Sequence, residues 1–426
     1  MDYVVVGAGP AGVLAVETLR KTDAEGKITL IGAEDEPPYS RMAIPYLLEG
    51  NIEEAGTHLR KGVDHYRNLN IEVLRNQRVA KVDPEARQVV LENGDTRSYD
   101  KLLLATGSRP ITPPVPGLDQ EGIYPCWTLA HARMVKEKLT AGAHVVLIGA
   151  GFIGTIILDA IGSHELTLTV VEAETHMTPR MMNLTGGDVI KSWCASKNVS
   201  VLTSTLVEAV EAGGERKFTL KLNNGDTLPA DLIVTATGVE AILDYLAGSG
   251  IETDEGILVN DRLQTNLPGV YAAGDCAQGI DFSTGGFSVH AIQPTAAEHG
   301  RIAALNMAGQ AVAYRGSLIM NVIATLGLTT YSFGQWMGVE GGEHGEFLDQ
   351  EKSRYIRLEF KDDLLVGAIN IGAFEHVGVL RGMIQNRIPL GEWKEKLKEN
   401  PQHLMDAYLV LTEFGKNIPI MTPAAG

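Results

Sequence analysis

Two glycine-rich segments of this chain have the residue types and spacing that bind the phosphates of a dinucleotide. The first, VVVGAGPAG, supplies Gly7, Gly9, Pro10, Ala11 and Gly12, and the second, VVLIGAGFIG, supplies Gly149, Gly151, Phe152, Ile153 and Gly154. In this motif the first glycine makes a tight turn and the second lets backbone N–H groups approach a pyrophosphate. The third lets the helix pack on the strand, so that the phosphates lie at a helix N-terminus. We therefore predict that one chain binds two dinucleotides.

The surroundings of both segments favour this prediction. Each segment follows a run of β-branched residues, 4–6 and 145–148, and precedes an apolar helical stretch. Glu34 and Glu172 then stand near the spacing at which a carboxylate binds the ribose hydroxyls of the adenosine half. A solvated strand end is the alternative interpretation of either acid.

Glu172 also bears on the choice between NADH and NADPH. A carboxylate at this position repels a 2′-phosphate, so the second segment is predicted to prefer NADH. Arg180 and, to a lesser extent, His176 follow it closely in the sequence, and either side chain moving toward a 2′-phosphate would favour NADPH instead.

Composition limits the classes of protein and partner. The 426 residues suffice for two to three domains, and 44% of them are hydrophobic, as in ordinary globular proteins. A net charge of −17 argues against nucleic acid and anionic membrane surfaces as partners. It also slows encounter with an acidic protein, unless a local basic patch reverses the sign. Residues 381–398 are the candidate patch, although interrupting glutamates favour a solvated helix face.

The cysteines exclude one kind of redox chemistry. Cys126, Cys194 and Cys276 show no CxxC or CxxxxC spacing, so no redox-active dithiol is predicted. Cys276 is expected to be a small buried residue, with participation as a thiol as the alternative. No cluster of His, Cys, Asp or Glu has metal-ligand spacing, so no metal site is predicted.

The sequence also gives an expectation about location. The chain passes from Met1 and Asp2 directly into the first predicted strand, without the pattern of a signal peptide. Residues 145–162 are apolar, but their glycines and Asp159 fit a strand, a turn and a helix better than a membrane span. We expect a cytoplasmic protein that does not insert into membranes.

The predicted fold class is α/β, with two Rossmann-like dinucleotide-binding domains and an α/β C-terminal domain. The first domain is expected to be discontinuous, comprising residues 1–108 and 242–310, because the chain returns to it after the second domain, residues 109–241. A proline-rich linker, ITPPVPG, makes the first crossing. Residues 311–426 form the third domain, with strand alternation in RYIRLEF and LLVGAINIG followed by two helical segments.

The order of the motifs resembles the pyridine nucleotide-disulfide oxidoreductase superfamily of flavoproteins over nearly the whole chain. It is most similar to the NADH-dependent ferredoxin, rubredoxin and nitrite reductase type. The motifs that carry the resemblance are GAGPAG (7–12), PPYSRMAIPYL (37–47), LLLATGSRP (102–110), GAGFIG (149–154), TATG (235–238), YAAGD (271–275) and LNMAG (305–309).

The resemblance implies FAD at the first segment and NADH at the second, with NADPH less favoured. It places Glu34 on the adenosine ribose, Arg41 near the pyrophosphate, the Val79 backbone by the adenine and Asp275 by the ribityl chain or pyrophosphate. The same motifs add cofactor-binding residues in the small-residue turns, namely Ala105, Thr106, Gly107, Gly238 and Gly274. Hydride passes directly from nicotinamide to flavin, so no catalytic acid or base is predicted.

The implied function is an FAD-dependent NAD(P)H:acceptor oxidoreductase. It passes electrons from NADH through FAD to an iron–sulfur or rubredoxin-like protein, or to an iron–sulfur subunit of a larger enzyme. Two alternatives stay open: a peroxide-forming NADH oxidase, and a non-catalytic flavoprotein that responds to NADH by changing its shape or oligomeric state. A homodimer is a possible oligomeric state under each of these interpretations.

Three positions depart from the pattern of relatives. Met42 stands where the oxidases and disulfide reductases have a cysteine, Tyr46 or Pro45 where oxygenase-coupled reductases have a lysine, and Ile156 where many relatives have a glutamate. Loss of both charges together leaves an apolar pocket, because an unpaired buried charge costs several kcal/mol. We predict that Ile156 makes an apolar contact on the flavin or nicotinamide side; packing of its helix on the sheet is the alternative.

Two further segments hold candidate side chains. In FSVHAIQP, His290 and Gln293 are candidates for contact with the flavin ring, with a structural histidine as the alternative. In YSFGQW, the aromatic residues Tyr331, Phe333 and Trp336 are candidates for a docking or dimer surface, with core packing as the alternative for at least two of them.

Overall fold

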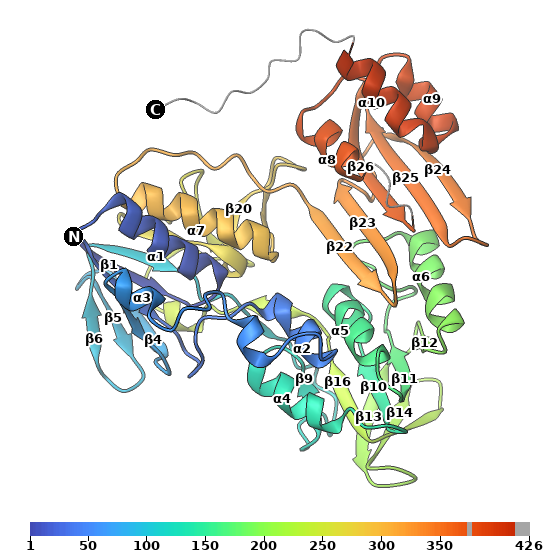
Figure 1. Cartoon of the computed structure of the whole chain (residues 1–426), viewed down its shortest axis with the longest axis horizontal. Helices are drawn as coiled ribbons and strands as arrows, with labels where there is room; N and C mark the ends of the chain where they lie inside the picture. Colours follow the sequence, from blue (N-terminus) through green and yellow to red (C-terminus); the bar gives the residue numbers. More distant parts are fainter. Residues whose placement is uncertain (373–376, 414–426) are drawn as a thin grey trace.

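Three main sheets organise the chain, as Figure 1 shows for the computed structural model. The structure describes residues 1–372 and 377–413. Two of these sheets are parallel and carry the glycine-rich segments, and the third is antiparallel and belongs to the C-terminal part. The predicted α/β class with two Rossmann-like units is confirmed.

The first sheet has the strand order β19-β7-β1-β2-β3 and is parallel throughout. Its strands are β1 (Asp2–Val6), β2 (Lys27–Ile31), β3 (Ile71–Leu74), β7 (Lys101–Leu104) and β19 (Val270–Ala272). Continuous apolar runs form these strands because a parallel sheet is buried on both faces. On one side, α1 (Pro10–Thr22) lies next to α7 (Gln293–Met307), so segments far apart in sequence form one unit (Figure 1).

Smaller elements surround this sheet. They are the antiparallel strands β4 (Val79–Asp83), β5 (Gln88–Leu91) and β6 (Thr96–Ser98), the strands β18 (Ile257–Leu258), β20 (Ala277–Ile280) and β21 (Phe287–Val289), the short helices α2 (Ile44–Leu48) and α3 (His65–Asn68), and the 3-10 turns η1 (Arg41–Ala43), η2 (Glu54–Thr57), η3 (Asp244–Leu246) and η4 (Gly274–Cys276).

The second parallel sheet has the order β12-β11-β10-β16-β9. Its strands are β9 (Ile123–Pro125), β10 (His144–Ile148), β11 (Thr167–Val171), β12 (Ser200–Leu202) and β16 (Leu232–Thr235), and its helices are α4 (Leu129–Lys138), α5 (Phe152–Gly162) and α6 (Leu184–Ser196). An antiparallel sheet of β13 (Val207–Ala212), β14 (Phe218–Leu222) and β15 (Thr227–Ala230) adjoins it. The two crossings between the units pair with each other as β8 (Ser108–Pro110) and β17 (Val239–Ala241).

The C-terminal part is an antiparallel sheet in the order β22-β23-β26-β25-β24. It comprises β22 (Met320–Thr325), β23 (Leu328–Gly334), β24 (Glu343–Asp349), β25 (Arg354–Lys361) and β26 (Leu364–Ile371), followed by α8 (Val377–Gln385), α9 (Trp393–Glu399), η5 (Pro401–His403) and α10 (Leu404–Glu413). Both strand segments predicted by alternation, in β25 and β26, and both predicted helical segments are confirmed. Phe414, the last residue of the second helical segment, lies outside the described residues.

This part is attached to the second parallel unit. Strand β22 packs on α5, and Asp159 of α5 accepts a hydrogen bond of 2.5 Å from the Leu326 backbone N–H in the turn after β22. Trp193 of α6 donates to the Leu326 carbonyl at 3.1 Å. Phe333 and Trp336 are buried in the core, which confirms core packing for these two aromatic residues.

In the part of the chain that the structure describes, no helix has both the length and the apolar character needed to cross a membrane.

Candidate functional site

One large cavity, of about 1400 Å³, reaches both glycine-rich segments. Its wall includes the carboxyl ends of β1 and β10, the crossing strands β8 and β17, the start of α7 and residues 319–321 at the start of β22. Parallel sheets bind ligands at the carboxyl ends of their strands. The two segments therefore face a shared space rather than separate sites.

The first glycine-rich segment shows why its glycines are spaced as they are. Gly7 has φ +118°, and a Cβ there would lie 1.9 Å from the Ala105 carbonyl oxygen. A Cβ at Gly12 would lie 1.9 Å from the Gly7 carbonyl oxygen, so this glycine lets α1 approach the strand. A Cβ at Gly9 would meet no atom within 4 Å, because this residue borders the cavity.

The second segment repeats this geometry. A Cβ at Gly149 would lie 2.4 Å from the Ala236 carbonyl oxygen, and one at Gly154 would lie 2.1 Å from the Gly149 carbonyl oxygen, whereas Gly151 borders open space. Gly9 and Gly151 are the N-cap residues of α1 and α5, and neither helix start is capped by a side chain. The N–H groups in the first turn of both helices, which in α1 begin at Ala11 because Pro10 has none, are thus available to an anion, and this fits the pyrophosphate of a dinucleotide.

Glu34 lies at the cavity wall but is not a freely solvated acid. The Tyr39 hydroxyl donates to its Oε2 at 2.8 Å, and the Arg41 guanidinium pairs with its Oε1 at 3.3 Å. Arg41 also donates to the Ser108 carbonyl at 3.1 Å and lies 4.8 Å from the Trp127 ring centroid. Arg41 is therefore fixed against the cavity wall.

Glu172 is buried, with 7% of its surface exposed. Its Oε2 accepts a hydrogen bond of 2.6 Å from the Ala150 N–H, inside the second glycine-rich turn, and its Oε1 accepts one of 2.9 Å from the Glu174 N–H. The carboxylate thus holds the turn in place while it borders the cavity, so the interpretation as a solvated strand end is wrong for Glu172. Two side chains were named that would favour NADPH by moving toward a 2′-phosphate. Of these, Arg180 borders the cavity, whereas His176 Nε2 lies 3.0 Å from the Met182 carbonyl.

Asp275 lies near the middle of the wall. Burial raises the pKa of its carboxyl group, while the hydrogen bond from the Ser108 hydroxyl, 3.1 Å long, and the charge of Arg41 oppose that shift. Nearby, the Thr106 hydroxyl lies 3.2 Å from that of Tyr245, a buried residue. These contacts tie the turn after β7 to η4 and η3, so polar groups of three segments converge at one place.

Part of the cavity wall is apolar. Ile156 borders the cavity together with Met42, Ile44 and Pro45. Tyr46 does not line the cavity and is 55% exposed, so Pro45 is the neighbour that faces it. The predicted apolar pocket is present, and the contact of Ile156 with a flavin or nicotinamide stays a prediction.

The structure brings most predicted site residues to this cavity. Those that line it are Gly7, Gly9, Pro10, Ala11, Glu34, Arg41, Val79, Ala105, Thr106, Gly107, Gly149, Gly151, Phe152, Ile153, Glu172, Gly238, Gly274 and Asp275. Gly12 and Gly154 lie behind it, against the first glycine of each segment. Tyr39 and Trp127 were not predicted as site residues. Tyr39 lies within the motif 37–47, and Trp127 lies outside the motifs; single aromatic residues of this kind are common at core positions as well.

The cysteines are free and apart from one another. All three are buried, and burial raises the pKa of Cys126, the one that borders the cavity, to about 12. A thiol of this kind is a poor nucleophile at neutral pH. Among residues 1–372 and 377–413, no three His, Cys, Asp or Glu side chains are placed to hold a metal ion.

Comparison with known proteins places this geometry in a family. Residues 1–300 match the family described as pyridine nucleotide-disulphide oxidoreductase. The chain belongs to this family. It is therefore an oxidoreductase of the flavin- and nicotinamide-dependent kind, with FAD and NADH as its cofactors.

Relatives cover nearly the full chain. It is 31% identical over 404 residues to the NADH-dependent phenylglyoxylate dehydrogenase subunit epsilon of Aromatoleum evansii, covering 94% of this chain and 95% of the relative. It is 30% identical to the 3-phenylpropionate/cinnamic acid dioxygenase ferredoxin–NAD(+) reductase component of Photorhabdus laumondii, covering 90% and 96%. The solved covalent putidaredoxin reductase–putidaredoxin complex contains a chain with the same fold, with a TM-score of 0.89 and 22% identity over 96% of this chain and 99% of that one.

Proposed function

We propose that this protein oxidises NADH with bound FAD and passes the electrons to an iron–sulfur or rubredoxin-like protein, as a partner or as a subunit of a larger enzyme. One observation carries the proposal: both nucleotide-binding segments open into the same cavity. Bound FAD supplies the chemistry that accepts a hydride and releases electrons one at a time.

The chain's own residues serve this reaction by binding and orientation. The helix starts at Gly9 and Gly151 receive the pyrophosphates, while Arg41 offsets phosphate charge and Glu172 holds the second turn. Ile156 and Pro45 keep the space between the nucleotides apolar. Exclusion of water and fixed orientation are what direct hydride transfer needs from a protein.

The choice of acceptor rests on the site and on the relatives. The cavity holds Met42 where a thiol would be needed for disulfide or persulfide chemistry, and its one cysteine is buried with a raised pKa. One relative is a subunit of a dehydrogenase and another is a ferredoxin–NAD(+) reductase component. We infer a protein acceptor of the same class here.

A steady-state experiment tests this proposal. Purified protein with FAD is mixed with NADH and either a ferredoxin, a rubredoxin or air-saturated buffer alone. We expect reduction of at least one iron–sulfur or rubredoxin carrier to exceed oxygen consumption. Peroxide formation faster than reduction of every carrier would contradict the proposal and support the NADH oxidase instead.

Several sequence predictions stay proposals. We propose a first domain of residues 1–108 and 242–310, a second of residues 109–241 and a third of residues 311–426. The pairing of β19 with β7 supports the two-part first domain. Residues 373–376 and 414–426 of the third domain lie outside the described part. Limited proteolysis tests these bounds. We also propose a cytoplasmic location, which cell fractionation tests, and a homodimer, which light scattering tests.

A further inference from the structure

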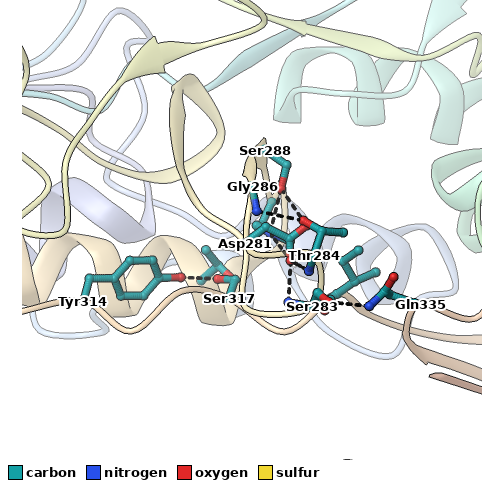
Figure 2. A network of polar contacts seen from close by, with 11 residues as sticks. Asp281, Ser283, Thr284, Gly286, Ser288, Tyr314, Ser317 and Gln335 are labelled. Carbon is teal, nitrogen blue, oxygen red and sulfur yellow. Dashed lines mark hydrogen bonds and ion pairs between the residues drawn. The ribbon is translucent and has the colours of Figure 1, made fainter. Parts of the chain in front are cut away.

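One carboxylate of the cavity wall has no partner in the described part of the chain. The acids that line the cavity are Glu34, Glu36, Glu172, Glu174, Asp275 and Asp281. Three of them have the partners given above, and Glu36 accepts a hydrogen bond of 2.7 Å from Arg133. Asp281 accepts one of 2.7 Å from the Ser283 N–H, within a network of polar contacts (Figure 2). Glu174 is the exception, because it is exposed and no described residue donates to its carboxylate.

One arginine of the wall is in the same situation. The arginines that line the cavity are Arg41, Arg78, Arg109 and Arg180. Arg41 has the contacts given above, and Arg78 pairs with Glu92 at 3.5 Å. Arg109 donates to Glu240 at 2.8 Å. Arg180 is exposed and forms no ion pair or hydrogen bond with another described residue, so the wall holds one unpaired side chain of each charge.

The backbone of Glu174 is attached to the carboxylate of Glu172. Its N–H donates to Glu172 Oε1 at 2.9 Å, and its carbonyl accepts a hydrogen bond of 2.8 Å from the Ser204 N–H. The other oxygen of Glu172 accepts from the Ala150 N–H in the second glycine-rich turn. Glu172 is therefore fixed by the backbone, whereas the side chain of Glu174 is free to move beside it.

Arg180 is carried by a turn that is attached to the same glycine-rich segment. The Thr178 N–H donates to the Ala150 carbonyl at 2.8 Å. The N–H groups of Met181 and Met182 then donate to the Thr178 carbonyl at 2.9 and 3.0 Å, which closes the turn around Arg180. Thr178 has φ +52°, a conformation that a β-branched residue adopts only where its surroundings fix it. Both unpaired charges thus have a fixed origin close to the phosphate-binding turn.

These charges lie where NADH and NADPH differ. In a Rossmann unit, the carboxylate at the end of the second strand binds the ribose 2′-hydroxyl, which carries a phosphate in NADPH. Glu172 has that position, and Glu174 is bonded to it through the backbone. A phosphate monoester carries nearly two negative charges at neutral pH. A second carboxylate at this end of the cavity repels it, while a free guanidinium attracts it.

Resting on the proposed binding of NADH at the second segment, we propose that Glu174 is the residue that excludes NADPH and that Arg180 offsets part of this exclusion. Glu172 cannot be exchanged without loss of the bond that holds the turn, so it supports both nucleotides. Two other cations near this end are engaged elsewhere and do not line the cavity. Lys191 donates to the Thr203 hydroxyl at 2.8 Å, and His176 has the contact with the Met182 carbonyl given above.

Binding of nucleotide fragments tests this assignment without hydride transfer. ADP-ribose and its 2′-phosphate are titrated by calorimetry into the full chain saturated with FAD, which keeps the first site occupied. Glu174→Gln is compared with Glu215→Gln, a matched loss of charge in the exposed turn between β13 and β14, outside the cavity wall. We expect E174Q to bind the 2′-phosphate about fivefold more tightly than the wild type, with ADP-ribose changed less than about twofold. E215Q should match the wild type for both fragments.

The outcomes separate charge discrimination from a structural role. A structural role of Glu174 would change the affinity for both fragments together. An unchanged ratio of the two affinities in E174Q would overturn the proposal, as would a wild type that does not bind ADP-ribose. High salt should reduce the difference between E174Q and the wild type, because screening weakens the repulsion. Failure of NADH to reduce the flavin, with the fragment affinities as expected, would count against the proposed function alone.

Arg180→Gln tests the opposing charge. We expect it to weaken binding of the 2′-phosphate about fivefold and to change ADP-ribose less than about twofold. Equal weakening of both fragments would place Arg180 on the pyrophosphate and overturn its assigned part. Flavin reduction by NADH and NADPH in the same variants gives a second readout. The ratio of kcat/KM for NADPH to that for NADH should rise in E174Q, fall in R180Q and stay constant in E215Q.

Discussion

At Gly9 and Gly151, an added methyl group would meet no atom of the chain within 4 Å. Both residues have φ between −70° and −80° with extended ψ, which alanine adopts without strain. Their lack of a side chain is therefore explained by a ligand rather than by the fold. This is the clearest residue-scale evidence for the two nucleotides.

The two positions form a matched pair for mutagenesis. We expect Gly9→Ala to weaken FAD binding about tenfold or more, equivalent to ~1.4 kcal/mol, with the apoprotein still folded. Gly151→Ala should leave FAD in place and weaken NADH binding by a similar factor. Flavin content and an NADH titration measure the two effects. A G9A variant that keeps FAD but loses NADH would reverse the assignment of the two sites.

Residue spacing predicted the glycine-rich turns and both acids, because each follows directly from strand, turn and helix order, whereas Asp275 followed from the resemblance of the motifs. It did not predict that Tyr39 and Trp127 would complete the wall. Their positions depend on how the segment 37–46 folds over the second unit, as in the cation–π contact of Trp127 with Arg41. Contacts between segments so far apart leave no local pattern in a sequence.

At the scale of elements, the buried acid Glu17 of α1 joins this helix to two residues, Arg60 before α3 and His65 at its start. Arg60 donates to both oxygens of Glu17 at 2.6 Å, and His65 Nε2 lies 2.8 Å from Glu17 Oε1. Burial alone would raise the pKa of Glu17, but the bonds to Arg60 and His65 outweigh it, so the pKa is lowered. The cluster therefore stabilises the fold only while Glu17 is ionised.

This cluster gives a prediction about stability. We expect Glu17→Gln to lower the free energy of unfolding by about 2 kcal/mol at neutral pH, since it removes charged hydrogen bonds. Because the folded pKa is below the unfolded one, this contribution is present above the unfolded pKa, about 4, and is lost as pH falls through the folded pKa. Urea unfolding of both proteins across that range measures it. A difference that grows toward acid pH would contradict this interpretation.

Strand and helix types were predictable here because the apolar runs and turn residues are strong. Which strands belong to the same sheet could not be predicted from the local sequence pattern alone. The return of the chain to the first unit was predicted from the order of its segments, and the pairing of β19 with β7 agrees with it, whereas the packing of β22 on α5 had no signal in either strand or helix.

At the scale of the whole molecule, the net charge is −17, and the candidate basic segment, residues 381–398, does not form a strongly positive patch. Lys394 and Lys398 both pair with Glu343, and Lys396 pairs with Glu392. The three lysines of this segment are thus paired with glutamates, which supports their interpretation as a solvated helix face.

We therefore expect electron transfer to an acidic carrier to accelerate as salt is added, because screening relieves the repulsion between like charges. The second-order rate constant at low and at physiological ionic strength measures this. A rate that falls with salt would show that a basic patch elsewhere on the described surface, or outside it, directs docking.

In the proposed reaction, NADH bound at the second glycine-rich segment reduces FAD bound at the first. Anaerobic stopped-flow mixing with NADH tests it most directly, through the visible absorbance of the flavin. We predict bleaching at a rate that saturates with NADH in the wild type. In Gly151→Ala, about tenfold more NADH should be needed for half the maximal rate. A wild-type flavin that NADH does not bleach, or a G151A variant with unchanged NADH dependence, would contradict the claim.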